Sequence, residues 1–269
     1  MRAGGAVPMG IGGVLVLLVL SYFTGVDFMS LIGDGGAPSS QTETVGTNEP
    51  VNATPEEEKM VLFVDAVMQD AEETWQQLMG GSYQPTRAVL FRDAVQSTCG
   101  MAESAVGPFY CPADRKVYLD LSFFNELRTR FGAPGDFAQA YVLAHEVGHH
   151  VQTVLGTEGK VRQLQQSNPS QRNELSVRME LQADCYAGVW GHVASADGRA
   201  AQGKVELEPD DLEEGLRAAS AIGDDTIQKR STGRVMPDKF THGTSAQRVE
   251  WFRRGFSSGD PNACNTFGS

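Results

Sequence analysis

The residues of this chain best suited to chemistry lie between positions 141 and 156, which read YVLAHEVGHHVQTVLG. Within them His145, Glu146 and His149 form an H-E-x-x-H pattern. Residues four apart lie on nearly the same face of an α-helix, so the two imidazoles could bind one zinc ion. Glu146 could then reach a water at the metal and act as a general base. The alternative is a helix with incidental histidines, although the chain has only five histidines in all.

The helix that must carry these residues has recognisable ends. Pro134, Gly135 and Asp136 supply a helix breaker and an N-cap candidate, and Gly156 stands where a C-cap is expected. Gly148 falls in the middle, where it costs roughly 1 kcal/mol relative to alanine. We therefore expect another element to approach the helix closely at Gly148; the alternative is a tolerated defect.

A catalytic zinc needs a third protein ligand and one open position. Gln152 and Leu155 stand where the longer H-E-x-x-H-x-x-G-x-x-H pattern would need Gly and His, so the third ligand should be a carboxylate on a later element. Glu174 and Glu180 compete on the next expected helix. They are six residues apart and point in roughly opposite directions, so only one can face the metal.

We favour Glu180 because of its surroundings. Its face of the helix is mostly small and carries Ser176, Val177, Ala183, Asp184, Ala187 and Gly188. Such a face would let this helix press closely on the metal helix. Asp184, one turn on, is placed to accept a hydrogen bond from the non-ligating nitrogen of a zinc-bound histidine. The alternative is that Glu180 and Asp184 are a solvated acidic pair. Glu174 lacks such surroundings, and we expect it to be a solvated residue.

His242, in FTHGTSAQRVEWF, is the remaining candidate. A histidine just before a helix could donate a hydrogen bond to the oxyanion formed when water attacks a peptide carbonyl. The alternative is a histidine in a surface turn. Arg248 could hold this segment by an ion pair, and we assign His150 and His192 to packing or to the surface.

The N-terminal residues predict on which side of a membrane such a site would lie. After Arg2, an apolar run over residues 6–23 favours a transmembrane anchor within residues 1–32; a cleaved secretory signal is the alternative. Because Arg2 precedes the run and no Lys or Arg follows it until Lys59, the N-terminus should stay in the cytoplasm and the rest of the chain should lie outside it. Residues 33–54 have almost no large apolar side chain and predict a flexible linker. The net charge of −12 argues against nucleic acid as a partner.

Residues 55–269 predict one α+β domain, with a small antiparallel or mixed sheet, the metal helix and a helical C-terminal part. We expect helices over residues 55–79, 124–131, 168–192, 209–227 and 245–256, a strand over 87–95, and a hairpin of 109–111 with 116–121.

The cysteines are Cys99, Cys111, Cys185 and Cys264, without a C-x-x-C pattern. Outside the cytoplasm they should be oxidised. We favour Cys99 with Cys111, between neighbouring strands, and Cys185 with Cys264, which would clamp the C-terminal tail onto the helix of Glu180. Free buried thiols are the alternative.

Four motifs occur in order: GPFYCPADRKVYLD, HEVGHH, RMELQADCYAGVW and FTHGTSAQRVEWFRRGF. Together they resemble the bacterial neutral zinc metallopeptidase family over roughly residues 55–267. The resemblance implies a single N-terminal membrane segment followed by a zincin-like domain. Glu180 to Asp184 is similar to the third-ligand motif of gluzincin peptidases, and Thr-His-Gly at 241–243 is similar to their Thr-His-Pro, which favours His242. By analogy with zincins, residues 116–121 would be an edge strand that binds an extended peptide; the alternative is an ordinary internal strand.

These patterns lead us to expect a membrane-anchored, extracytoplasmic zinc endopeptidase that acts on a peptide or protein substrate. Zn²⁺ would be held by His145, His149 and Glu180, with Glu146 as general base and His242 at the oxyanion. The alternatives are a zinc amidase acting on cell-wall peptides, or a non-catalytic scaffold or chaperone-like module that contains zinc. Zinc coordination alone does not need Glu146, which counts against the scaffold. The pattern gives no oligomeric state.

Overall fold

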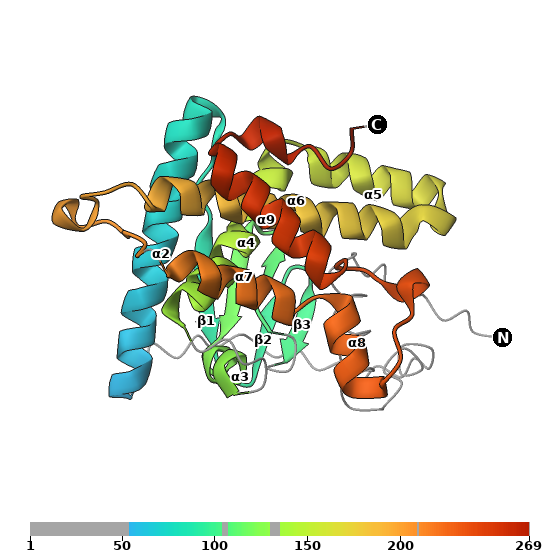
Figure 1. Cartoon of the computed structure of the whole chain (residues 1–269), viewed down its shortest axis with the longest axis horizontal. Helices are drawn as coiled ribbons and strands as arrows, with labels where there is room; N and C mark the ends of the chain where they lie inside the picture. Colours follow the sequence, from blue (N-terminus) through green and yellow to red (C-terminus); the bar gives the residue numbers. More distant parts are fainter. Residues whose placement is uncertain (1–53, 104–106, 130–134, 209, 269) are drawn as a thin grey trace, which may run out of the picture.

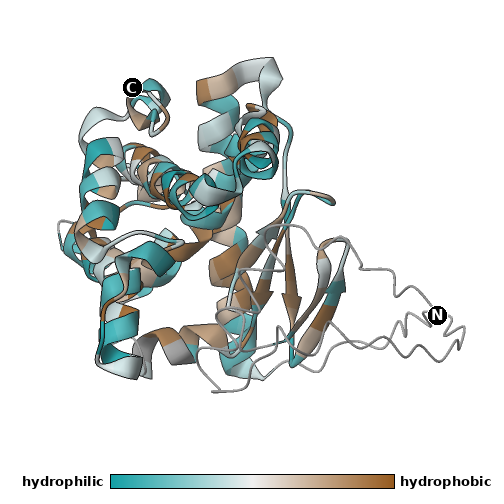
Figure 2. Ribbon diagram, turned by 90° about the vertical axis from the view of Figure 1, so that its right-hand side faces the viewer, coloured by the Kyte–Doolittle hydropathy of each residue, from teal (hydrophilic) through white to brown (hydrophobic). Residues whose placement is uncertain are grey.

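The helix that carries the H-E-x-x-H pattern lies between a small sheet and a group of C-terminal helices. The computed structural model describes residues 54–103, 107–129, 135–208 and 210–268. Its strands gather on one side of the molecule and most of its helices on the other, as Figure 2 shows. The α+β class predicted from the sequence is confirmed.

In chain order the helices and strands are α2 (Pro55–Met79), β1 (Arg87–Phe91), β2 (Ala94–Ser97), β3 (Gly100–Glu103), β4 (Phe109–Cys111), β5 (Lys116–Asp120), α3 (Phe123–Thr129), α4 (Asp136–Val154), α5 (Thr157–Ser167), α6 (Arg172–Ala194), α7 (Asp211–Ala221), α8 (Asp224–Thr232) and α9 (Ser245–Ser258) (Figure 1).

The main sheet is three-stranded and mixed, in the order β1-β5-β4. β4 and β5 form the predicted antiparallel hairpin, whereas β1 pairs with β5 in parallel. The expectation that residues 116–121 form an edge strand is wrong, because β5 is the central strand. A hairpin pattern reveals only one partner of β5, and the parallel pairing with β1 joins segments far apart in the chain. Of the two hairpin strands, β4 is the one at the edge of the sheet.

The predicted strand over 87–95 is divided. β1 ends at Phe91, and Asp93 adopts a positive φ of 64°, after which β2 pairs with β3 in a separate two-stranded sheet. The helix expected over 209–227 is also divided, into α7 and α8. Gly223 lies at the break, where a Cβ would stand 2.3 Å from the backbone nitrogen of Ser245 at the start of α9. Helix α5 was not expected from the sequence.

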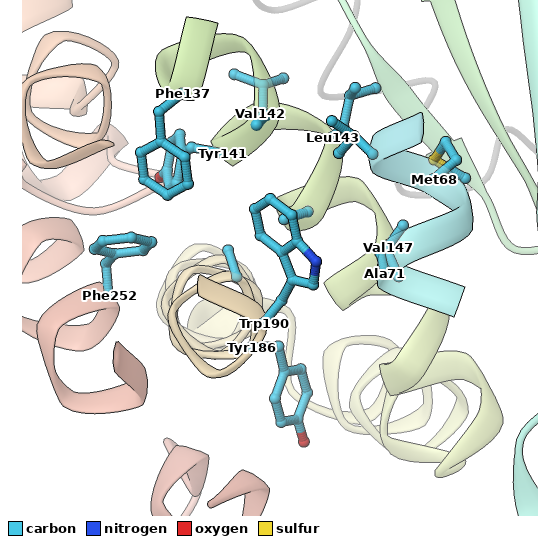
Figure 3. Packing of buried hydrophobic residues seen from close by; sticks show 14 of the residues in the cluster. Met68, Ala71, Phe137, Tyr141, Val142, Leu143, Val147, Tyr186, Trp190 and Phe252 are labelled. Carbon is cyan, nitrogen blue, oxygen red and sulfur yellow. The ribbon is translucent and has the colours of Figure 1, made fainter. Parts of the chain in front are cut away.

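The core packs around Trp190 of α6. Figure 3 shows its indole surrounded by Phe137 and other side chains of α4, with α2 on one side and Phe252 of α9 on the other. Trp190 is fully buried and its Nε1–H donates to Asp70 of α2 over 2.9 Å. This packing fixes α6, which carries Glu180, relative to α4.

Close helix crossings depend on small residues. A Cβ on Gly148 of α4 would lie 2.9 Å from the carbonyl oxygen of Ala183 in α6, which confirms the close approach expected there. The small face of α6 serves two neighbours, however. A Cβ on Gly188 would lie 2.1 Å from the carbonyl oxygen of Phe252, so Gly188 packs against α9 and not against the metal helix.

Both favoured disulfides are present. Cys99 bonds to Cys111 and tethers the β2–β3 hairpin to β4, and Cys185 bonds to Cys264 and holds the C-terminal tail on α6.

The anchor expected over residues 1–32 lies outside the described residues, as does the linker over 33–54 up to residue 53. Among the residues that are described, no helix is both long and apolar enough to cross a membrane.

Candidate metal centre

His145 and His149 come from consecutive turns of α4, and Glu180 faces them from α6. The Nε2 atom of His145 lies 3.2 Å from Oε2 of Glu180, and Nε2 of His149 lies 3.6 Å from Oε1 of the same carboxylate. The prospective ligand atoms of all three residues lie within 4.8 Å of one another. The structure therefore brings together the three residues that the sequence selected as ligands.

The donor set fits zinc. Ligand atoms about 2.1 Å from a tetrahedral ion stand roughly 3.4 Å apart. That separation lies between the two observed nitrogen–oxygen distances of 3.2 and 3.6 Å. Two imidazole nitrogens and one carboxylate also match the donors of catalytic zinc sites that keep a fourth position open. These three side chains would hold the metal.

Asp184 orients the first histidine. Its Oδ1 lies 2.8 Å from Nδ1 of His145 and also accepts a hydrogen bond from the hydroxyl of Tyr141. Arg248 of α9 donates hydrogen bonds to both carboxylate oxygens of Asp184, over 2.8 and 2.9 Å. Burial by itself would raise the pKa of Asp184, but Arg248 and His145 outweigh it and lower the pKa to about 2. Asp184 is therefore a permanent anion that keeps the proton of His145 on Nδ1. The ion pair expected for Arg248 is made with this carboxylate.

The second histidine has a different partner. Nδ1 of His149 lies 2.9 Å from Oε1 of Gln152, which is fully buried one turn further along α4. The sequence analysis used Gln152 only to exclude the longer H-E-x-x-H-x-x-G-x-x-H pattern and missed its contact with His149. Its spacing of three residues from a ligand histidine was the available signal.

Glu146 is 7% exposed and lies beside the two histidines. Burial raises the pKa of its carboxyl group, while the charges of His149 and His145 and the backbone N–H of Tyr110 in β4 oppose the shift. A carboxylate with a raised pKa is a stronger base than one in water. The involvement of Tyr110 also places the edge strand β4 next to this group.

His242 is held by a carboxylate that the sequence analysis missed. Asp224, at the start of α8, accepts the backbone N–H groups of Thr241, His242 and Gly243 on one oxygen over 2.7, 2.7 and 3.0 Å. Its other oxygen lies 3.2 Å from Nδ1 of His242. Burial would lower the pKa of His242, but Asp224 and the charge of Glu180 raise it. The imidazole is thus close enough to the ligand carboxylate for their charges to interact.

The remaining candidates have structural roles. His150 is fully buried, where it hydrogen-bonds to the carbonyl of Gln84 and to the hydroxyl of Tyr110 over 3.0 Å. His192 is exposed and bonds to the carbonyl of Phe256. Glu174 is exposed and pairs with Arg178 within its own helix, as expected for a solvated residue.

Comparisons with known proteins also point to zinc. The family model described as "Putative neutral zinc metallopeptidase" matches residues 1–267. The uncharacterized protein YpfJ of Escherichia coli (strain K12) is 50% identical over 271 residues, which cover 98% of this chain and 90% of that protein. The uncharacterized protein Rv2575 of Mycobacterium tuberculosis (strain ATCC 25618 / H37Rv) is 46% identical over 208 residues, 76% of this chain and 69% of that protein. No solved structure matches the chain.

Proposed function

The chain belongs to the neutral zinc metallopeptidase family, and from that premise we propose that it is a zinc-dependent endopeptidase. The observation that carries the proposal is the convergence of His145, His149 and Glu180 beside the buried carboxyl group of Glu146. Zinc held by these ligands would supply Lewis acidity, which polarises a carbonyl and lowers the pKa of water.

The residues around the metal ligands have distinct tasks in this reaction. Glu146 accepts the proton of the attacking water and delivers it to the leaving amine, a role supported by its raised pKa. His242 donates a hydrogen bond to the oxyanion, a role supported by its raised pKa and by the orientation that Asp224 gives its ring.

We propose that the substrate lies as an extended chain along β4. Within the described residues β4 pairs with β5 alone, so its other side can add a strand. The contact of Glu146 with the N–H of Tyr110 supports this choice, because it places the general base beside that edge. This arrangement replaces the expected role of residues 116–121.

The mechanism predicts that Glu146→Gln keeps zinc and loses turnover. The amide preserves the shape of the side chain but cannot accept a proton, so kcat should fall by at least about 100-fold. Zinc content and kcat would be measured on the same preparation, with an unfolded protein and with cell-wall peptides as substrates. A Glu146→Gln protein that cleaves at the wild-type rate would exclude Glu146 as the base.

We further propose that the domain works outside the cytoplasm, tethered by residues 1–32. The two disulfides support an oxidising compartment, where such bonds persist. Protease added to intact cells or spheroplasts should digest the domain but spare a tag at the N-terminus; protection of both ends would contradict this topology.

A further inference from the structure

A chain of buried amides connects His149 to the C-terminal disulfide. Oε1 of Gln152 lies 2.9 Å from Nδ1 of His149, and Nε2 of Gln152 donates to Oε1 of Gln182 over 3.2 Å. Nε2 of Gln182 then donates to the carbonyl oxygen of Cys264 over 2.8 Å. Gln152, Gln182 and Cys264 are 0%, 5% and 0% exposed, so water does not compete for these bonds. We call Gln152 and Gln182 the amide relay.

Backbone carbonyls fix the direction of the amide relay. The Cys264 carbonyl can only accept, so Gln182 must turn its NH₂ group towards it and its Oε1 towards Gln152. Gln152 is constrained in the same way, because its NH₂ group also donates to the carbonyl of Met179 over 2.7 Å. Oε1 of Gln152 is therefore left to face His149, and the imidazole must carry its proton on Nδ1. Nε2, which faces Glu180, keeps the lone pair that a metal needs.

The far end of the relay is anchored covalently. Cys264 lies in the C-terminal tail and is bonded to Cys185 of α6, one turn from Gln182. Thr266 adds a second attachment by donating its hydroxyl to the carbonyl of Arg178 over 2.7 Å. The tail is thereby held at the position where its carbonyl meets Gln182.

We propose that Gln152 and Gln182 are positioning residues that lock the tautomer and orientation of His149, and that the Cys185–Cys264 disulfide secures this lock from the C-terminal tail. The inference rests on the metal site of the proposed function but not on its peptidase activity. A histidine whose second nitrogen is unpartnered loses both its fixed tautomer and part of its basicity.

Gln152→Leu and Gln152→Glu form a matched pair. Both lose the hydrogen bond from the Gln152 amide to the Met179 carbonyl, but only glutamate retains an acceptor for His149. Gln152→Leu should weaken zinc affinity by about 10- to 100-fold, whereas Gln152→Glu should stay within a few-fold of wild type. Affinity would be measured by competition with a chelator. Nitrogen NMR of the zinc-bound protein would report whether His149 Nδ1 carries the proton.

Gln182→Leu tests whether the relay acts as one unit. Alone, it should weaken zinc affinity by less than about 10-fold, because Met179 still holds Gln152. In the Gln152→Leu background it should cause no further loss, since its effect passes through Gln152. Replacing both Cys185 and Cys264 by alanine should likewise weaken zinc affinity in the otherwise wild-type protein. In the Gln182→Leu background the same replacement should cause no further loss.

Gln165→Leu is the control. Gln165 is 3% exposed and donates to the Arg172 carbonyl over 3.1 Å, but it lies outside the relay. This variant should lose stability and keep its zinc affinity.

The proposal is overturned if Gln152→Leu binds zinc within twofold of wild type, or if the Gln152→Leu and Gln182→Leu substitutions weaken zinc binding additively. A wild-type chain that does not bind zinc would overturn the proposed function as well, whereas zinc binding without peptidase activity would overturn only that function.

Discussion

At the scale of single residues, the centre depends on which nitrogen of each histidine carries its proton. Asp184 fixes the proton of His145 on Nδ1 by its charge, and Gln152 fixes that of His149 by the direction of its amide. Both Nε2 atoms are thus directed at Glu180. The position of Asp184 could be inferred from helical spacing, whereas that of Gln152 depends on carbonyls from two other segments.

Asp224→Asn should impair catalysis while sparing the metal. An asparagine retains one acceptor oxygen but loses the charge that holds His242, so kcat should fall by roughly 10-fold and zinc affinity should not change. His242→Ala should cause a similar loss, and the double variant no more than either single one. Steady-state kinetics and chelator competition would measure both quantities.

Asp225→Asn is a neighbouring control for that experiment. Asp225 accepts hydrogen bonds from the backbone N–H and the hydroxyl of Ser245 over 2.8 and 2.7 Å. Within the described part of the chain it makes no hydrogen bond to the His242 ring or to residues 241–243. It should lower stability without lowering kcat. Equal losses of kcat in the two variants would show that Asp224 has only a structural role.

At the scale of elements, the separation between α4 and α6 decides whether three ligands can share one ion. His145 and His149 move with α4 and Glu180 moves with α6, so any outward shift lengthens the distances to the carboxylate. Gly148 permits the observed separation because Ala183 backbone atoms come as close as 2.9 Å to the position of a Cβ.

Gly148→Ala should therefore push the two helices apart. We expect a loss of about 1–3 kcal/mol in the free energy of unfolding, as for other overpacked core sites, together with weaker zinc binding. Thermal unfolding and chelator competition would measure these effects. Gly159→Ala is the matched control, because a Cβ on Gly159 of α5 meets nothing within 4 Å. It should gain up to about 1 kcal/mol from helix propensity alone; a gain for Gly148→Ala as well would contradict the close approach.

At the scale of the whole molecule, the centre joins segments from most of the described chain. α4 and α6 supply the ligands, α9 supplies Arg248, α8 supplies Asp224, and the C-terminal tail is bonded to α6. A ligand that binds only this assembled state must stabilise the entire fold.

Chelation of zinc should consequently lower the melting temperature of the protein. Zinc at 100 times its Kd stabilises a fold by about 2.7 kcal/mol, which corresponds to roughly 5–10 °C for a domain of this size. Differential scanning fluorimetry with and without a chelator would show the shift, and zinc added back should reverse it. Glu146→Gln should retain the shift, whereas Glu180→Gln should lose most of it. An unchanged melting temperature in the wild type would argue against a bound metal.

Elements with strong local signals could be predicted from the residues alone. The 3.6-residue period of apolar residues predicted a helix over residues 55–79, where the structure has α2, and the H-E-x-x-H spacing placed two histidines on one helical face. Helical spacing likewise separated Glu180 from Glu174. These inferences held because each depends on residues within a few turns of one another.

Features that depend on contacts between distant segments became visible only in the folded chain. The parallel pairing of β1 made β5 the central strand and left β4 at the edge, and the start of α9 against Gly223 divided α7 from α8. The direction of the Gln152 amide beside His149 and the carboxylate partner of His242 were also beyond the sequence. A buried polar group takes whichever donor or acceptor the packed fold brings to it, and for Gln152 and Asp224 those partners come from other helices, turns and carbonyls.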